Sequence, residues 1–155
     1  MRIVLVEPDI PQNVGAAIRA AACFGASLEI IEPCGFPLDS REVRRVAMDY
    51  GLLAPPLAHA SWRMFHENLA GRSSRLVLLT TKSAESLWDF RFAPDDILLL
   101  GRESAGVPEE IHAAADARIK IPMAEGARSL NVATAGAIAL AEARRQIGWD
   151  AYGVA

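Results

Sequence analysis

Short apolar runs alternate with amphipathic stretches along most of this 155-residue chain, and this alternation limits the possible folds more than any other feature. Runs of four or five apolar residues bounded by turn residues are typical of buried parallel strands, and the stretches between them have helical periodicity. We expect strands at residues 3–6, 28–31, 76–80, 97–100 and 117–121, with a weaker one at 56–58. The pattern predicts an α/β fold with a mostly parallel sheet and helices on both faces, in a single domain spanning residues 1–155.

Helices are expected at residues 14–24, 40–45, 62–69 and 131–147, and another is expected to begin at Pro108. Asn13, Ser61 and either Ser129 or Asn131 are candidate N-caps, because their side chains can accept from free backbone N–H groups. Residues 149–155 are expected to form a loose tail. From these patterns alone the simplest arrangement is flavodoxin-like.

Four polar loops each follow an expected strand: 7–13, 81–84, 101–106 and 122–130. In a parallel sheet such loops lie at one edge, the carboxyl edge, where ligands bind. Each loop has an ordinary structural interpretation as well. Arg19 could close a surface ion pair, Gly101–Gly106 could be a simple strand-to-helix connection, and Ser129 or Asn131 could only cap a helix.

The order of the motifs in these loops is more specific than any one of them. The chain has P-x-N-x-G-x-x-x-R from Pro11 to Arg19, then G-x-E-x-x-G from Gly101 to Gly106, then I-P-M and R-S-L-N between Ile121 and Asn131. This order resembles the three signature motifs of the SPOUT-superfamily RNA methyltransferases. The segments VEPDIPQNVGAAIR and IIEPCGF are similar to its TrmL-like group, whose members are short proteins that 2′-O-methylate the wobble nucleotide of certain tRNAs.

The resemblance implies a SPOUT fold, whose C-terminal part forms a trefoil knot, and S-adenosylmethionine as the methyl donor. The positions that match the family's cofactor-binding residues are Leu79, Gly101, Ile121, Ser129 and Leu130, and those that match its catalytic residues are Arg19, Glu103 and Asn131. It also implies a homodimer whose interface completes the site, which suits the small residues of the last helix, although these could equally pack within one chain. No metal is expected. Arg102 and Ala16 depart from residues common in the family, so the RNA target could differ.

Arg19 is expected to contact a phosphate and to stabilise the developing alkoxide, since a guanidinium normally stays charged. It would accept a proton only if its pKa were unusually lowered. The net charge of −3 argues against a general nucleic-acid coat protein but allows a local basic surface. We expect one such surface that binds a tRNA anticodon stem-loop, formed with Arg19 by six further cations: Arg41, Arg44, Arg45, Lys82, Arg102 and Arg128.

The apolar stretches are too short to span a bilayer and no signal-peptide pattern is present, so we expect a cytoplasmic protein. Two alternatives stay open. One keeps the fold and cofactor but acts on another tRNA or rRNA site, and the other is a non-catalytic, flavodoxin-like binding module.

Overall fold

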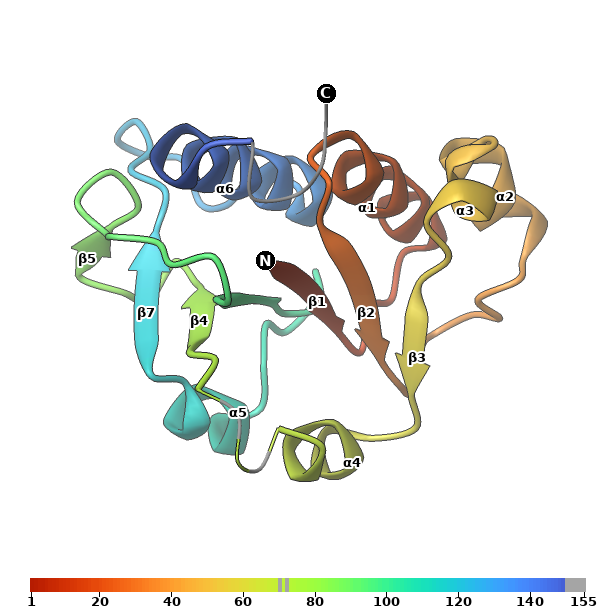
Figure 1. The fold of residues 1–155 in the computed structure, drawn as a ribbon, viewed down its shortest axis with the longest axis horizontal. Coiled ribbons are helices and arrows are strands. Elements are labelled where there is room, and N and C mark those ends of the chain that lie inside the picture. Colours follow the sequence, from red (N-terminus) through yellow and green to blue (C-terminus); the bar gives the residue numbers. More distant parts are fainter. Residues whose placement is uncertain (70, 72, 150–155) are drawn as a thin grey trace.

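The computed structural model describes residues 1–69, 71 and 73–149, and its seven strands form one sheet in which every neighbouring pair is parallel (Figure 1). The strands are β1 (Arg2–Val6), β2 (Ser27–Ile31), β3 (Leu57–His59), β4 (Leu76–Leu79), β5 (Glu85–Ser86), β6 (Ile97–Leu100) and β7 (Ala117–Lys120). Their order is β3-β2-β1-β6-β4-β7-β5. The expected parallel sheet and all six expected strands are confirmed, with ends within about one residue of the prediction.

The central strands β4 and β6, and β1 after Arg2, are apolar because both faces of the sheet are covered. In β1, Ile3 and Leu5 belong to one hydrophobic core, whereas Val4 and Val6 belong to the other. All four are at most 2% exposed. Adjacent side chains point to opposite faces, so a strand covered on both sides needs apolar residues at every position.

Helices lie on both faces, as predicted (Figure 1). One face carries α1 (Pro11–Cys23), α2 (Arg41–Ala47), α3 (Tyr50–Leu53) and α6 (Val132–Ile147), and the other carries α4 (Trp62–Glu67) and α5 (Glu109–Ala114). The predictions missed α3 and β5. Elements of four and two residues are too short to have a measurable periodicity.

Helix ends confirm some caps and correct others. Ser61 Oγ accepts from Met64 N at 3.3 Å, and Asn131 Oδ1 accepts from Thr134 N at 3.1 Å, so Asn131 rather than Ser129 caps α6. Pro108 occupies the N-cap of α5 instead of its first turn.

The prediction that Asn13 caps α1 is wrong. The helix begins at Pro11, whose fixed φ suits the first helical position, and Asn13 lies one turn inside with only 7% of its surface exposed. Its side chain is therefore free to make contacts outside its own helix.

The flavodoxin-like strand order is also wrong, because β6 lies between β1 and β4. This insertion brings the carboxyl ends of β1, β6, β4 and β7 side by side. Whether the chain threads a knot, and whether it is a single domain, stay predictions. Of the expected tail, residues 150–155 lie outside the described residues. Within the described part of the chain, no helix is long and apolar enough to cross a membrane.

Candidate functional site

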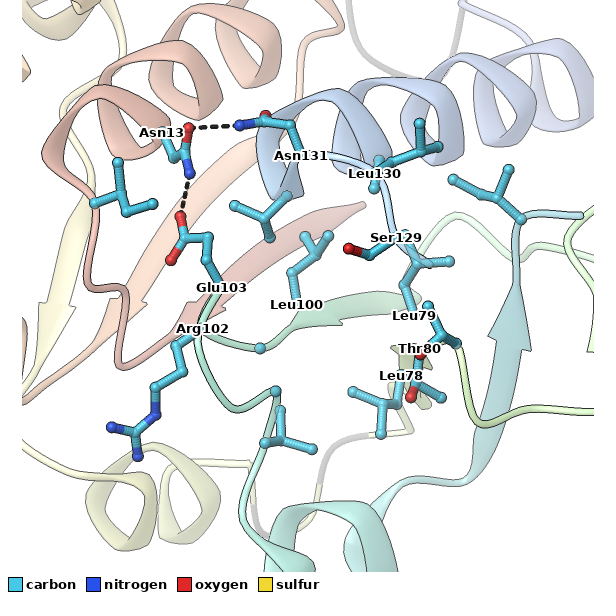
Figure 2. A pocket seen from close by; sticks show the side chains of 18 of the residues that line it. Asn13, Leu78, Leu79, Thr80, Leu100, Arg102, Glu103, Ser129, Leu130 and Asn131 are labelled. Carbon is cyan, nitrogen blue, oxygen red and sulfur yellow. Dashed lines mark hydrogen bonds between the residues drawn. The ribbon is translucent and has the colours of Figure 1, made fainter. Parts of the chain in front are cut away.

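A pocket of about 450 Å³ opens at the carboxyl edge of β4, β6 and β7, beside the first turns of α1 and α6 (Figure 2). Such a volume suits a small-molecule or cofactor site. Eight sequence-predicted residues line it: Leu79, Gly101, Arg102, Glu103, Ile121, Ser129, Leu130 and Asn131. The structure thus brings all five expected cofactor-binding positions and two of the three expected catalytic ones around one cavity.

The other lining residues are not among the predicted site residues, although Asn13 and Gly106 belong to the motifs. They are mostly apolar or at strand ends: Ile10, Asn13, Leu78, Thr80, Thr81, Leu100, Gly106, Val107, Met123, Val132 and Ala135. Leu78 and Leu100 are buried strand residues, which sequence patterns do not distinguish from ordinary core residues. Asn13 carried the strongest available signal, since it belongs to the P-x-N-x-G motif, but it was interpreted as a cap.

Gly101 and Gly106 close the loop after β6 into a tight hairpin. Arg102 and Gly106 exchange backbone hydrogen bonds of 3.1 and 2.9 Å. A Cβ on Gly101 would lie 2.4 Å from the carbonyl carbon of Gly106, and Gly106 itself has φ +74°. Both positions therefore require glycine, and the hairpin presents Arg102 and Glu103 at the pocket.

Three side chains from different motifs form a directional hydrogen-bond chain at one end of the pocket (Figure 2). Asn131 Oδ1 is committed to the α6 cap, so its Nδ2 donates to Asn13 Oδ1 at 2.7 Å. Asn13 Nδ2 then donates to Glu103 Oε1. An amide can donate only through nitrogen, so this chain fixes Glu103 Oε1 as an acceptor.

Asp9 N donates to Glu103 Oε2 at 3.4 Å, so the Asp9 and Glu103 carboxyl groups are near enough for each to shift the pKa of the other. Burial, followed by the Asp9 carboxyl, raises the pKa of Glu103 above its ordinary value, although the Asn13 amide acts in the opposite direction. Hydrogen bonds from Glu103 and then Ser104 lower the pKa of Asp9 to about 2. Asp9 is therefore the charged member of the pair, and Glu103 is the one that more readily holds a proton.

Arg102 points away from this polar chain (Figure 2). Its Nη2 donates to Glu7 Oε2. Its side chain is 36% exposed, so the guanidinium can still reach a phosphate. Glu7 has φ +47°, a left-handed conformation that is uncommon for a residue with a Cβ and is often found at functional sites.

Arg19 is absent from the lining of the pocket. It is exposed on α1, where Nη1 donates to Met48 Sδ at 3.6 Å and the guanidinium lies over the Tyr50 ring at 5.6 Å from its centroid. Within one chain, therefore, the structure does not bring Arg19 to the loops that hold Glu103 and Asn131.

The other expected cations are also divided. Arg41, Arg44 and Arg45 are exposed on α2, which packs on α1 near the β3 edge of the sheet, whereas exposed Lys82 lies next to β5 at the opposite edge (Figure 1). The single patch expected from the sequence is not formed by one chain. Loop positions along the sequence cannot show which edge of a sheet each loop occupies. Among the described residues, no group of three or more His, Cys, Asp or Glu could hold a metal ion.

Comparison with known proteins gives a consistent result. The SpoU rRNA methylase family matches residues 1–141. A protein of Ancylobacter novellus named tRNA (cytidine(34)-2′-O)-methyltransferase is 53% identical, over 96% of this chain and 94% of its own length. A protein of Beijerinckia indica with the same name is 51% identical, over 94% and 91%.

Solved structures agree. One, described as "Structural insights into the 2-OH methylation of C/U34 on tRNA", superposes with a TM-score of 0.89 at 40% identity and covers 94% of this chain and 95% of its own. The SpoU methyltransferase AviRb of Streptomyces viridochromogenes, in complex with the cofactor AdoMet, gives a TM-score of 0.87 at 28% identity. The match covers 94% of this chain and 60% of AviRb.

Proposed function

The chain belongs to the SpoU rRNA methylase family, and on this basis we propose that it transfers a methyl group from S-adenosylmethionine to the ribose 2′-hydroxyl of nucleotide 34, the wobble nucleotide, of tRNA. The observation that carries the proposal is the pocket itself. Three motif loops and the start of α1 surround one cavity with an apolar end and a polar end. The relatives from Ancylobacter novellus and Beijerinckia indica, which match over more than nine tenths of their own length, are named for the cytidine of nucleotide 34.

The pocket fits S-adenosylmethionine in size and chemistry. Apolar side chains at Leu79, Ile121 and Leu130 offer surfaces for the adenine ring. The hairpin at Gly101 exposes backbone groups that can hydrogen-bond a nucleoside, and Ser129 adds a hydroxyl. When bound there, S-adenosylmethionine supplies a methyl group activated by an adjacent sulfonium.

Besides binding the methyl donor, the protein must orient the ribose and stabilise the charge that develops on the ribose oxygen. Correct alignment of the reacting groups can contribute about 7–11 kcal/mol in favourable cases. The polar chain of Asn131, Asn13 and Glu103 has a fixed direction, so it offers a rigid set of partners at that end of the pocket.

We assign Arg19 its role in a homodimer. Arg19 lies outside the pocket of its own chain, so it can act on the reaction only if a second copy brings its own Arg19 to that pocket. There it would contact a phosphate next to nucleotide 34 and stabilise charge on the ribose oxygen. A homodimer would also bring cations from two chains onto one anticodon stem-loop, including those of α2 and the loop that carries Arg128. The cytoplasm, where tRNA occurs, is the proposed location.

The test is methyl transfer from radiolabelled S-adenosylmethionine to bulk tRNA. The proposal predicts incorporation into tRNA in preference to rRNA, and a thermal shift with S-adenosylhomocysteine but not with NAD or FMN. Stabilisation by NAD or FMN without methyl transfer would instead support a flavodoxin-like binding module. Labelling of rRNA but not tRNA would be consistent with the same fold and cofactor but would identify rRNA as the substrate.

A further inference from the structure

The hydrogen bond of 3.4 Å from Asp9 N to Glu103 Oε2 places Asp9 directly beside the Glu103 carboxyl group, which lines the polar end of the pocket. Asp9 lies in the loop after β1 and Glu103 in the hairpin after β6, so the pair exists because these two strands are neighbours in the sheet. Asp9 Oδ1 is buried, and among the described residues it has no hydrogen-bond partner. A buried carboxylate oxygen without a donor favours sharing a proton with its neighbour.

The two oxygens of Glu103 have different surroundings. Oε1 accepts from Asn13 Nδ2, whose direction is fixed through Asn131 by the cap of α6. Among the described residues, the one hydrogen bond to Oε2 is the long contact of 3.4 Å from Asp9 N, so this oxygen keeps room for a proton. A proton that is transferred to Glu103 therefore binds to Oε2, beside Asp9.

Groups from two neighbouring elements face the Glu103 carboxyl group. Asp9 comes from the loop after β1, and Asn13 comes from α1 with Asn131 of α6 behind it. Glu7 and Arg102, which lie nearby, form an ion pair with each other. Asp9 is therefore the only one of these groups that puts a negative charge directly against Glu103.

We propose that Glu103 Oε2 accepts the proton of the ribose 2′-hydroxyl, and that Asp9 is a positioning residue that keeps Glu103 able to take it. This inference rests on the proposed function. The ribose oxygen forms its bond to the methyl carbon, the methyl–sulfur bond breaks with its electron pair going to sulfur, and the hydroxyl proton goes to Glu103. The balance needs no further reactant.

The assignment divides the chemistry between two residues according to their ordinary acidity. A guanidinium is permanently protonated, so Arg19 can stabilise negative charge but cannot accept a proton. A carboxylate in water is a weak base, and burial beside a second carboxylate makes it a stronger one. That is the situation of Glu103.

The test is the pH dependence of kcat/KM for tRNA methylation in two variants. Asp9→Asn removes the negative charge beside Glu103, so Glu103 loses its proton at lower pH and the acidic limb moves to lower pH. Asn13→Ala removes the donor to Oε1, so the acidic limb moves to higher pH. On that limb we expect Asp9→Asn to keep at least about threefold more of its plateau activity than wild type, and Asn13→Ala about threefold less.

Two controls separate this role from a structural one. Asp89→Asn removes the same charge at an exposed turn outside the pocket, and its acidic limb should match that of the wild type. Glu103→Gln should lose at least about 100-fold in turnover while still binding S-adenosylhomocysteine in calorimetry.

A second readout does not depend on activity. Carboxyl ¹³C NMR of the cofactor-free protein should show Glu103 titrating above an ordinary glutamate, at lower pH in Asp9→Asn and at higher pH in Asn13→Ala. Shifts of the kinetic limb in the same direction in both variants, or an unchanged Glu103 titration in Asp9→Asn, would overturn the proposal. Failure of the wild type to methylate tRNA would reject the proposed function instead, and the NMR titration would still report on the pair.

Discussion

At the scale of single residues, the site depends on side chains whose partners are far away in sequence. Asn13 contacts Asn131 across 118 positions and Glu103 across 90. Sequence reasoning identified Glu103 and Asn131 through their motifs but assigned Asn13 a local role. A side chain that can cap its own helix gives no sign, in sequence, that it instead lies inside the helix and bonds to distant residues.

Arg19→Lys is expected to reduce kcat for tRNA methylation at least about tenfold, which corresponds to about 1.4 kcal/mol. Lysine keeps the charge but loses the planar group that binds a phosphate through two hydrogen bonds. Steady-state kinetics at saturating S-adenosylmethionine would measure this. Near wild-type turnover would rule out a two-point contact.

Gly101→Ala is expected to abolish cofactor binding and to destabilise the fold by about 1–3 kcal/mol, because the new Cβ would meet the Gly106 backbone at 2.4 Å. Gly51→Ala is the matched control, since its Cβ would meet its nearest neighbour, Ala47 Cβ, at 3.8 Å. Calorimetric titration with S-adenosylhomocysteine and thermal unfolding of both variants would test this. Equal affinity in the two variants would contradict the role assigned to the hairpin.

At the scale of elements, the long strands and helices could be predicted because their periodicity follows from burial. The apolar residues of β1 and β6 indicate cover on both faces, and Gly148 marks the end of α6. The short elements β5 and α3 could not, since two or four residues give no period. The cavity-facing residues Leu78 and Leu100 likewise look like core residues.

Asn131 both caps α6 and orients the polar chain, and two substitutions separate these roles. Asn131→Asp keeps an acceptor for Thr134 N, so the cap should survive, but it removes the donor to Asn13. We expect an unchanged midpoint of thermal unfolding and at least about tenfold lower turnover. Asn131→Ala should lose activity and also about 1 kcal/mol of stability. A fully active Asn131→Asp variant would show that the polar chain is dispensable.

At the scale of the whole molecule, strand order was the feature that sequence patterns could not provide. Residues 97–100 could pair with any strand, and the structure places them between β1 and β4. That choice assembles the pocket, because it makes the first motif loop a neighbour of the second. The family resemblance, rather than periodicity, is what anticipated a SPOUT fold.

Acid stability should depend on Glu142, an almost buried carboxylate on α6. Hydrogen bonds from Arg145 and then Gln146 lower its pKa from 4.5 to about 2. A depressed pKa in the folded state means that the contribution to stability is complete above about pH 4.5 and is lost as the pH falls toward 2. Glu142→Gln should therefore be less stable than wild type at pH 7, with a difference that shrinks over that window. A difference independent of pH in urea unfolding would contradict this.

Salt should weaken tRNA binding if the arginines of α2 contact phosphates. Arg44→Gln is expected to lower affinity and to reduce the slope of log affinity against log salt by about 1. Arg63→Gln, on exposed α4 at the opposite face of the sheet, is the matched control and should leave the slope unchanged. Equal slopes for wild type and Arg44→Gln would exclude α2 from the RNA surface.

The most direct measurement is to map the methylated nucleoside in tRNA treated with the protein and S-adenosylmethionine, by nuclease digestion and mass spectrometry. A pocket that joins three motif loops around a methyl donor and a ribose predicts 2′-O-methylcytidine or 2′-O-methyluridine at nucleotide 34, and its loss with Arg19→Ala. Methylation on a base, or at a ribose elsewhere in the tRNA, would contradict it.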